Sequence, residues 1–200
     1  VKIPDGIDDR TVASMMLKGM TTQYLVRRTY AVKKGDTILV HAAAGGVGLI
    51  LVQWAKHIGA TVIGTVGSAD KAALAKAHGC DHTILYRETD FVAEVKKITG
   101  GKGVPVVYDG VGKDTFMPSL DCLSPRGLMA SFGNASGPVA PFSILTLSQK
   151  GSLYVTRPTL ATHIATREDL VATTNDLFAV VKSGKVKIEV NQTYALKDAA

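Results

Sequence analysis

The chain has 200 residues, of which 46% are hydrophobic and 20% are charged, a composition that suits one domain with one substantial core. No apolar run approaches the ~20 residues that span a bilayer, and no basic segment followed by an apolar one opens the sequence, so we expect a cytoplasmic protein without a membrane anchor. Cys80 and Cys122 form no ligand-spaced group, which argues against a disulfide framework and against a zinc site.

The net charge of +6 comes from 23 basic and 17 acidic side chains. The basic residues stand mostly in scattered pairs, such as Lys33-Lys34 and Lys96-Lys97, and do not form one block. Scattered charge of this kind is typical of a solvated surface. It therefore argues against a nucleic-acid partner, while it suits a small anionic ligand.

The first half of the chain alternates helical and strand patterns. Residues 11–28 carry apolar side chains at helical spacing, and Gly19 is expected to break this stretch into two helices. The expected strands that follow are 37–40, 61–66 and 82–86, and the expected helices after them are 49–59, 68–79 and 89–99. Gly59 and Gly79 stand where helices commonly end, and Ser68 is expected to cap the helix that it begins.

The second half continues the same alternation. The expected strands are 104–109, 127–133 and 151–156, and the expected helices are 114–121 and 167–183. Short apolar strands separated by helices predict a mainly parallel sheet of six strands with helices on both faces, which is the doubly wound (Rossmann) α/β fold. In such sheets, ligands bind beyond the carboxyl ends of the strands, where the order of the strands switches.

The clearest ligand motif is the segment HAAAGGVG at 41–48, between an expected strand and an expected helix. Ala43, Gly45 and Gly48 match the dinucleotide fingerprint, with alanine at its first glycine position. Gly45 has no Cβ and lets a phosphate approach the backbone, and Gly48 lets the helix pack close to the strand. Tight turns also use glycine for structural reasons alone, but a strand before and a helix after the segment favour dinucleotide binding.

The end of the strand 61–66 indicates which dinucleotide binds. An NAD site carries an acidic residue about 20 residues after the glycines, to hold the ribose hydroxyls. Here Gly67 and Ser68 stand at the strand end, and Lys71 follows within one helical turn. Asp70 lies at the helix start, where the dipole favours an acid. Lys71 can be interpreted as an ordinary solvated lysine, but together with the missing acid it favours NADPH.

Several stretches closely resemble the NADPH:quinone oxidoreductases, the zinc-independent, zeta-crystallin-like branch of the medium-chain dehydrogenases. They are LKGMTTQYL, the long segment from HAAAGGVG to GSADK, YDGVG, SFGN and QKGSLYVTRP. The resemblance implies direct hydride transfer from NADPH to a quinone, in which the protein orients the cofactor and no catalytic metal takes part. No catalytic residue is assigned, and His41, beside the glycine turn, is expected to be structural.

The resemblance also implies a set of cofactor-binding residues. The pyrophosphate loop of the family maps to Gly45, Gly46, Val47 and Gly48, and its 2′-phosphate site maps to Gly67, Ser68, Lys71 and Tyr86. The ribose and nicotinamide contacts map to Gly110, Val111, Phe132, Gly133 and Asn134, with Thr21 from the first helix. Core packing is the alternative interpretation for Phe132.

The family resemblance further predicts the domain organisation. It implies that residues 1–10 are a linker from a missing N-terminal GroES-like catalytic domain. Residues 11–200 would then be the NADP-binding Rossmann domain, truncated at its C-terminal end. We expect this chain to bind cofactor with little or no activity. It is also expected to form a homodimer through the edge strand 151–156, with Leu153 and Val155 on its apolar side.

Two other functions are compatible with the sequence. An enoyl reductase of the same superfamily would use the same NADPH domain on a different acceptor. A non-catalytic role that binds NADPH or RNA, as the zeta-crystallin resemblance allows, is the other alternative. The absence of arginine-rich or aromatic-interleaved stretches argues against RNA.

Overall fold

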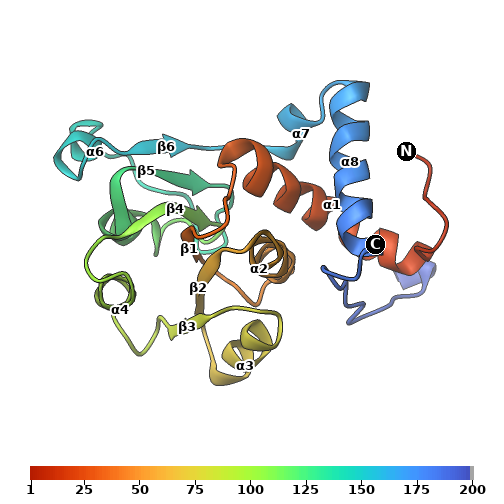
Figure 1. The fold of residues 1–200 in the computed structure, drawn as a ribbon, viewed down its shortest axis with the longest axis horizontal. Helices are drawn as coiled ribbons and strands as arrows, with labels where there is room; N and C mark the ends of the chain where they lie inside the picture. The colour runs from red at the N-terminus through yellow and green to blue at the C-terminus, as the bar shows by residue number, and fades with distance from the viewer. Residues whose placement is uncertain (199–200) are drawn as a thin grey trace.

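The computed structural model describes residues 1–198 and contains a sheet of six parallel strands with helices on both faces (Figure 1). The strands are β1 (Thr37–Val40), β2 (Thr61–Val66), β3 (His82–Leu85), β4 (Val104–Asp109), β5 (Leu123–Ser131) and β6 (Tyr154–Thr156). Their order is β3-β2-β1-β4-β5-β6, and every neighbouring pair is parallel. The predicted six-stranded Rossmann fold is confirmed, and its strand order switches between β1 and β4.

Alternation of side chains along the strands creates two cores. In β1, Ile38 and Val40 belong to one hydrophobic cluster, and Leu39 between them belongs to the other. Successive side chains of a strand point to opposite faces, so a strand that is apolar throughout must be covered on both sides. The two clusters are therefore the cores of the two helical layers.

The larger layer contains α1 (Asp9–Tyr24), α2 (Gly46–Ile58), α3 (Ala69–Ala77) and α8 (Arg167–Lys182). The opposite layer contains α4 (Phe91–Ile98) and α5 (Phe116–Ser119). Figure 1 shows α2 and α3 on one side of the sheet, α4 on the other, and α1 beside α8. Short helical segments lie at Leu25–Thr29, Leu120–Cys122, α6 (Leu145–Gln149), α7 (Leu160–His163) and Leu196–Asp198. None of the helices in the described chain is long and apolar enough to cross a membrane.

Gly19 does not break the first helix, and the prediction of two helices there is wrong. The residue is buried in the middle of α1, which continues into the wide turn Leu25–Thr29. A Cβ on Gly19 would lie 2.6 Å from Cδ1 of Leu177 in α8. The glycine therefore permits the close approach of two helices, an effect that a local pattern does not reveal.

Other differences concern the ends of elements. The strand expected at 151–156 begins only at Tyr154, because Gly151 and Ser152 have left-handed φ angles of 113° and 56°. The expected caps are confirmed: Oγ of Ser68 accepts from the Lys71 amide, and Gly59 ends α2 with a φ of 99°. At the chain ends, α1 begins at Asp9, inside the expected linker, and positions 199–200 of the expected domain lie outside the described residues.

Candidate cofactor site

The glycine turn joins the end of β1 to the start of α2 at the point where the strand order switches. Its left-handed residue is Ala42, with a φ of 53°, so the alanine at the first fingerprint position, Ala43, needs no positive φ. A Cβ on Gly48 would overlap the Ala42 carbonyl oxygen and lie 2.8 Å from the Ala43 carbonyl carbon. Glycine is therefore required at position 48 if α2 is to start this close to β1.

The first amides of α2 belong to Gly46, Val47 and Gly48. The opening amides of a helix have no partner within the helix, and Gly45 before them has no side chain to cap them. An anion placed here would meet free N–H groups and the positive end of the helix dipole. The geometry of these residues thus suits a pyrophosphate.

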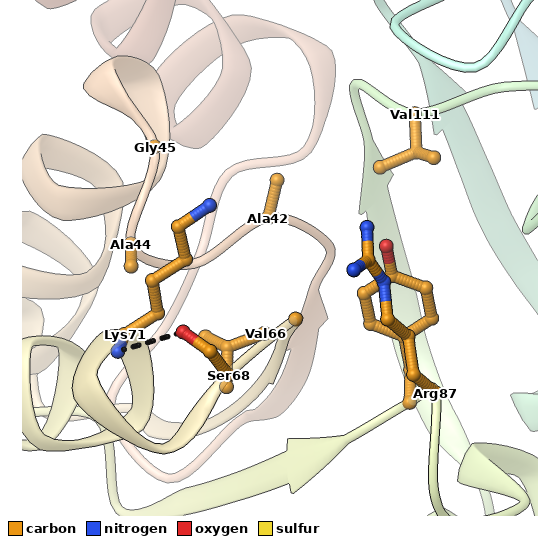
Figure 2. A pocket seen from close by; sticks show the side chains of 10 residues that line it. Ala42, Ala44, Gly45, Val66, Ser68, Lys71, Arg87 and Val111 are labelled. Atoms are coloured by element: carbon orange, nitrogen blue, oxygen red, sulfur yellow. Dashed lines mark hydrogen bonds between the residues drawn. The ribbon is translucent and has the colours of Figure 1, made fainter.

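A pocket of about 260 Å³ opens between this turn and the ends of β2 and β3. Its lining consists of Ala42, Ala44, Gly45, Val66, Gly67, Ser68, Lys71, Tyr86, Arg87 and Val111. Figure 2 shows Lys71 and Arg87 on opposite sides of the pocket, with Ala42 and Val111 at its upper edge. The lining contains two cations and no carboxylate, so its electrostatic potential favours an anionic ligand.

Local contacts hold the side chains at the ends of β2 and β3 in place. Ser68 is the N-cap of α3, so its hydroxyl is engaged with the backbone and its side chain is fixed at the pocket wall. The guanidinium carbon of Arg87 lies 5.9 Å from the centre of the Tyr86 ring. This cation–π contact holds the exposed Arg87 side chain against the face of the ring. A Cβ on Gly67 would lie 3.7 Å from both side chains, which is an ordinary van der Waals contact, so the glycine is not needed to avoid a clash.

Apart from Thr21, the residues mapped to the ribose and nicotinamide fall into three groups. Val111 lines the pocket, whereas Gly110 and Gly133 bring the ends of β4 and β5 together, since a Cβ on Gly133 would lie 2.8 Å from the Gly110 Cα. Phe132 packs its ring over Gly110 and against the larger core, so its packing role is visible in the structure. Asn134 lies instead at a separate, more open hollow of about 550 Å³ beside β6.

Thr21 and His41 both lie outside the lining of the pocket. Thr21 is 9% exposed in α1. His41 is 2% exposed, and its two ring nitrogens contact the hydroxyls of Thr65 and Ser119 at 2.8 and 2.7 Å. Burial lowers the pKa of His41 to about 4, so the ring is neutral near pH 7. These contacts agree with the structural role expected for this histidine.

Sequence reasoning missed four residues of the lining: Ala42, Ala44, Val66 and Arg87. Arg87 is the most informative of them, because it directly follows Tyr86 at the end of β3. The strand β3 neighbours β2 in the sheet, so its carboxyl end lies beside the residues that follow β2. If the strand order of the Rossmann fold had been assumed, Arg87 would have been predicted to lie at this pocket.

The described residues contain no group of three or more His, Cys, Asp or Glu side chains that is placed to hold a metal ion. Cys80 and Cys122 are both free and buried. Burial raises the pKa of Cys80 to about 11 and that of Cys122 to about 12, so both thiols stay protonated near pH 7. They pack as small apolar residues in the two cores.

Comparison with known proteins gives this geometry a family. The profile described as zinc-binding dehydrogenase matches residues 46–175. A quinone oxidoreductase of Pseudomonas aeruginosa is 56% identical over 200 residues, and a 2-haloacrylate reductase of a Burkholderia species is 49% identical over 203; each match covers 100% of this chain. The Escherichia coli quinone oxidoreductase complexed with NADPH superimposes with a TM-score of 0.92 at 53% identity, over 94% of this chain and 58% of that one.

The chain spans only part of these relatives. It covers 62% of the length of the Pseudomonas aeruginosa protein and 61% of the Burkholderia protein. The matched part contains the sheet, the glycine turn and the pocket with its two cations.

Proposed function

Because the chain belongs to the zinc-binding dehydrogenase family, we propose that it is the NADPH-binding domain of an enzyme that transfers a hydride from NADPH to a quinone. The observation that carries the proposal is the pocket at the ends of β2 and β3, which combines Lys71 and Arg87 with no carboxylate. NADPH differs from NADH by one phosphate on the adenosine ribose, and cations at this place discriminate between the two. The NADPH complex of the Escherichia coli quinone oxidoreductase supports the same choice.

The pyrophosphate would lie at the start of α2, on the amides of Gly46, Val47 and Gly48, with Gly45 allowing close approach. The 2′-phosphate would lie between Gly67, Ser68, Lys71 and Tyr86. Val111 lines the same pocket and would contact a ribose there. Toward the other end of the cofactor, the proposed contacts are Thr21, Gly110, Phe132, Gly133 and Asn134. The nicotinamide supplies the hydride, and the protein contributes binding and orientation.

The test is a fluorescence titration of the chain with NADPH and with NADH, repeated on Lys71→Ala. We expect NADPH to bind at least ~10-fold more tightly than NADH, and Lys71→Ala to remove most of this ratio, since ~1.4 kcal/mol is typical of a charge-assisted contact. Lys76→Ala is the matched control, because it removes the same charge from the same helix outside the pocket. Equal affinities for the two cofactors in the unaltered chain would overturn the NADPH assignment.

The acceptor is the second part of the proposal. The quinone oxidoreductases among the relatives support a quinone. The 2-haloacrylate reductase, at 49% identity, favours an activated carbon–carbon double bond as the alternative acceptor, of the same type as an enoyl reductase would use. Steady-state rates of the complete enzyme with a benzoquinone and with an activated alkene distinguish the two, because the preferred acceptor has the larger kcat/KM.

The length of the relatives supports the domain organisation that we propose. The residues before α1 would link this domain to a GroES-like catalytic domain, so the linker predicted as 1–10 is shortened to 1–8, and the residues from Asp9 onward would form the NADP-binding domain. The chain covers 62% of the Pseudomonas aeruginosa relative, which leaves room for a further domain in the complete enzyme. Two free buried cysteines support a reducing, cytoplasmic location.

A homodimer through β6 is also proposed. The strand β6 lies at the edge of the sheet, with β5 as its neighbour on one side, and exposed strand edges commonly pair with another chain. Leu153 is 6% exposed and already belongs to the smaller core, so it does not offer an apolar surface to a partner as the sequence suggested. Tyr154 and Val155, which are 62% and 36% exposed, would supply apolar contacts instead, one on each face of this edge strand.

A further inference from the structure

A connected set of buried polar side chains lies at the strand ends that support the pocket. His41 follows β1, Thr65 is in β2, Asp109 ends β4, and Thr115 and Ser119 stand at the start and the end of α5. Each of these five side chains is at most 2% exposed. Buried polar groups are costly unless they are paired, so the arrangement of their hydrogen bonds requires a structural or functional reason.

The hydrogen bonds around His41 permit one arrangement of protons. The Ser119 hydroxyl donates to the Thr115 carbonyl at 2.6 Å, which leaves its oxygen free to accept from Nε2–H of His41 at 2.7 Å. Nδ1 of the neutral ring then accepts from the Thr65 hydroxyl at 2.8 Å. Both nitrogens are satisfied, so the ring ties the end of β1 to β2 and to α5.

Asp109 ties the end of β4 to the same set. Its Oδ1 accepts from the Thr115 hydroxyl at 2.9 Å and from the amides of Val111 and Gly112 at 2.7 and 3.2 Å. Three donors on one carboxylate oxygen hold the segment after β4 in a fixed turn. Thr115 therefore connects the two halves of the set, because its hydroxyl donates to Asp109 and its carbonyl accepts from Ser119.

Each strand end held by this set carries a residue of the pocket lining. Ala42 follows His41, Val66 follows Thr65, and Val111 donates its amide to Asp109. Figure 2 shows Ala42 and Val111 on different walls of the pocket, with Val111 above Arg87. The hydrogen bonds thus fix the spacing of three walls that come from three different strands.

We propose that the set formed by His41, Thr65, Asp109, Thr115 and Ser119 positions the strand ends so that the pocket fits the adenosine part of a dinucleotide. The five are positioning residues, since they act on the ligand through Ala42, Val66 and Val111. This inference rests on the proposed function and deepens it. The adenosine part is common to NADPH and NADH, so breaking the set weakens both cofactors by a similar factor, unlike the loss of Lys71.

The test uses Thr115→Val, which removes the connecting hydroxyl and keeps the side-chain shape. Kd values for NADPH and NADH are measured by titration, with Thr173→Val as the matched control. Thr173 is, like Thr115, 1% exposed, but its hydroxyl has no hydrogen-bond partner among the described residues and lies in α8. We expect Thr115→Val to weaken both cofactors about tenfold and Thr173→Val to leave them within about twofold.

Rescue separates positioning from general damage to the fold. Thr115→Ser restores the hydroxyl and loses a buried methyl group, so we expect it to recover the affinity lost in Thr115→Val even though its Tm stays lower. Amide NMR shifts of Val111 and Gly112 report the same set without any cofactor, and they should move in Thr115→Val and return in Thr115→Ser. If Thr115→Val does not fold, Ser119→Ala, which removes the partner of His41 Nε2, provides the same comparison.

The outcomes distinguish this inference from the proposed function. Binding of both cofactors to Thr115→Val with the affinity of the unaltered chain overturns the positioning role and leaves the NADPH assignment intact. An affinity loss that Thr115→Ser fails to recover, or that Thr173→Val reproduces, also overturns it, because the loss then follows general destabilisation. An unaltered chain that binds neither cofactor overturns the proposed function and this inference with it.

Discussion

The two ends of the sheet differ in how completely this chain encloses them. At the β1–β2–β3 end, the pocket of about 260 Å³ is lined by residues from the turn and strand ends, and buried hydrogen bonds support it. At the β6 end, a wider hollow of about 550 Å³ is lined by Pro141, Phe142 and Val155. Large apolar side chains are exposed beside it, with Ile144 at 81% and Tyr154 at 62%.

This difference indicates that the two ends have different requirements. The β1–β2–β3 end, where we propose that the adenosine part binds, is built from consecutive strand–helix units, so this chain supplies its shape. The β6 end carries an exposed edge and exposed apolar side chains, which are typical of surfaces that another chain or domain covers. Cofactor binding and association should therefore respond to different substitutions.

The largest effect is expected at Gly48, where the start of α2 lies closest to the backbone that follows β1. In Gly48→Ala the new methyl group would overlap the backbone of Ala42 and Ala43, which cannot move without displacing β1 or α2. We expect a loss of about 3 kcal/mol in the free energy of unfolding, measured with urea, together with the loss of NADPH binding. In the control Gly46→Ala the methyl group meets the flexible Lys18 side chain, so a loss of less than about 1 kcal/mol is expected.

The next effect concerns the pH dependence of stability. Burial lowers the pKa of His41 to about 4, opposed by the charge of Asp109, while the unfolded chain has the ordinary value of 6.5. The unfolded state then binds more protons between these two values, so stability is lost as the pH falls from about 6.5 toward 4. The full shift corresponds to a loss of about 3 kcal/mol.

Urea unfolding between pH 7 and 5 measures this slope in the unaltered chain and in His41→Asn. Only part of the shift is spanned in this range, so between pH 7 and 5 the unaltered chain is expected to lose about 2 kcal/mol more of its free energy of unfolding than His41→Asn. His163→Asn is the control. Burial and the charge of Arg28 also lower the pKa of His163, so this second histidine contributes to the pH dependence of stability with the same sign as His41. Parallel curves for the unaltered chain and His41→Asn would show that His41 is not the group responsible.

Much of the fold and of the site could be predicted because the determining interactions are local. Ser68 caps a helix that begins one residue later, and Gly59 ends one, so short segments contain both the cause and the effect. The prediction that Gly19 breaks the first helix was wrong because the glycine is needed for close packing against Leu177, which lies more than 150 residues away in the chain. Arg87 was missed for a related reason, since only the pairing of β3 with β2 brings it to the pocket.

A smaller effect is expected on association through β6. Tyr154→Lys would place like charges opposite one another where two copies of the edge strand meet about a twofold axis. We expect the dimer dissociation constant to rise about tenfold, measured by sedimentation equilibrium, with NADPH affinity unchanged. Leu17→Lys is the control, because Leu17 is a 69% exposed apolar residue on α1, away from the β6 edge. A chain that is monomeric before any substitution would contradict the dimer itself.

The smallest effect is expected at Arg87, the cation that sequence reasoning missed. Its side chain is exposed and lies along the Tyr86 ring, so water screens its attraction for a phosphate more than a buried contact would be screened. Arg87→Ala should weaken NADPH about threefold and NADH by less, with Arg167→Ala on α8 as the control for loss of an exposed arginine. Raising the salt concentration should shrink the difference between Arg87→Ala and the unaltered chain, because the contribution is electrostatic. A loss that is equal for both cofactors and independent of salt would instead place Arg87 against the adenine ring, where its role is stacking and not recognition of the phosphate.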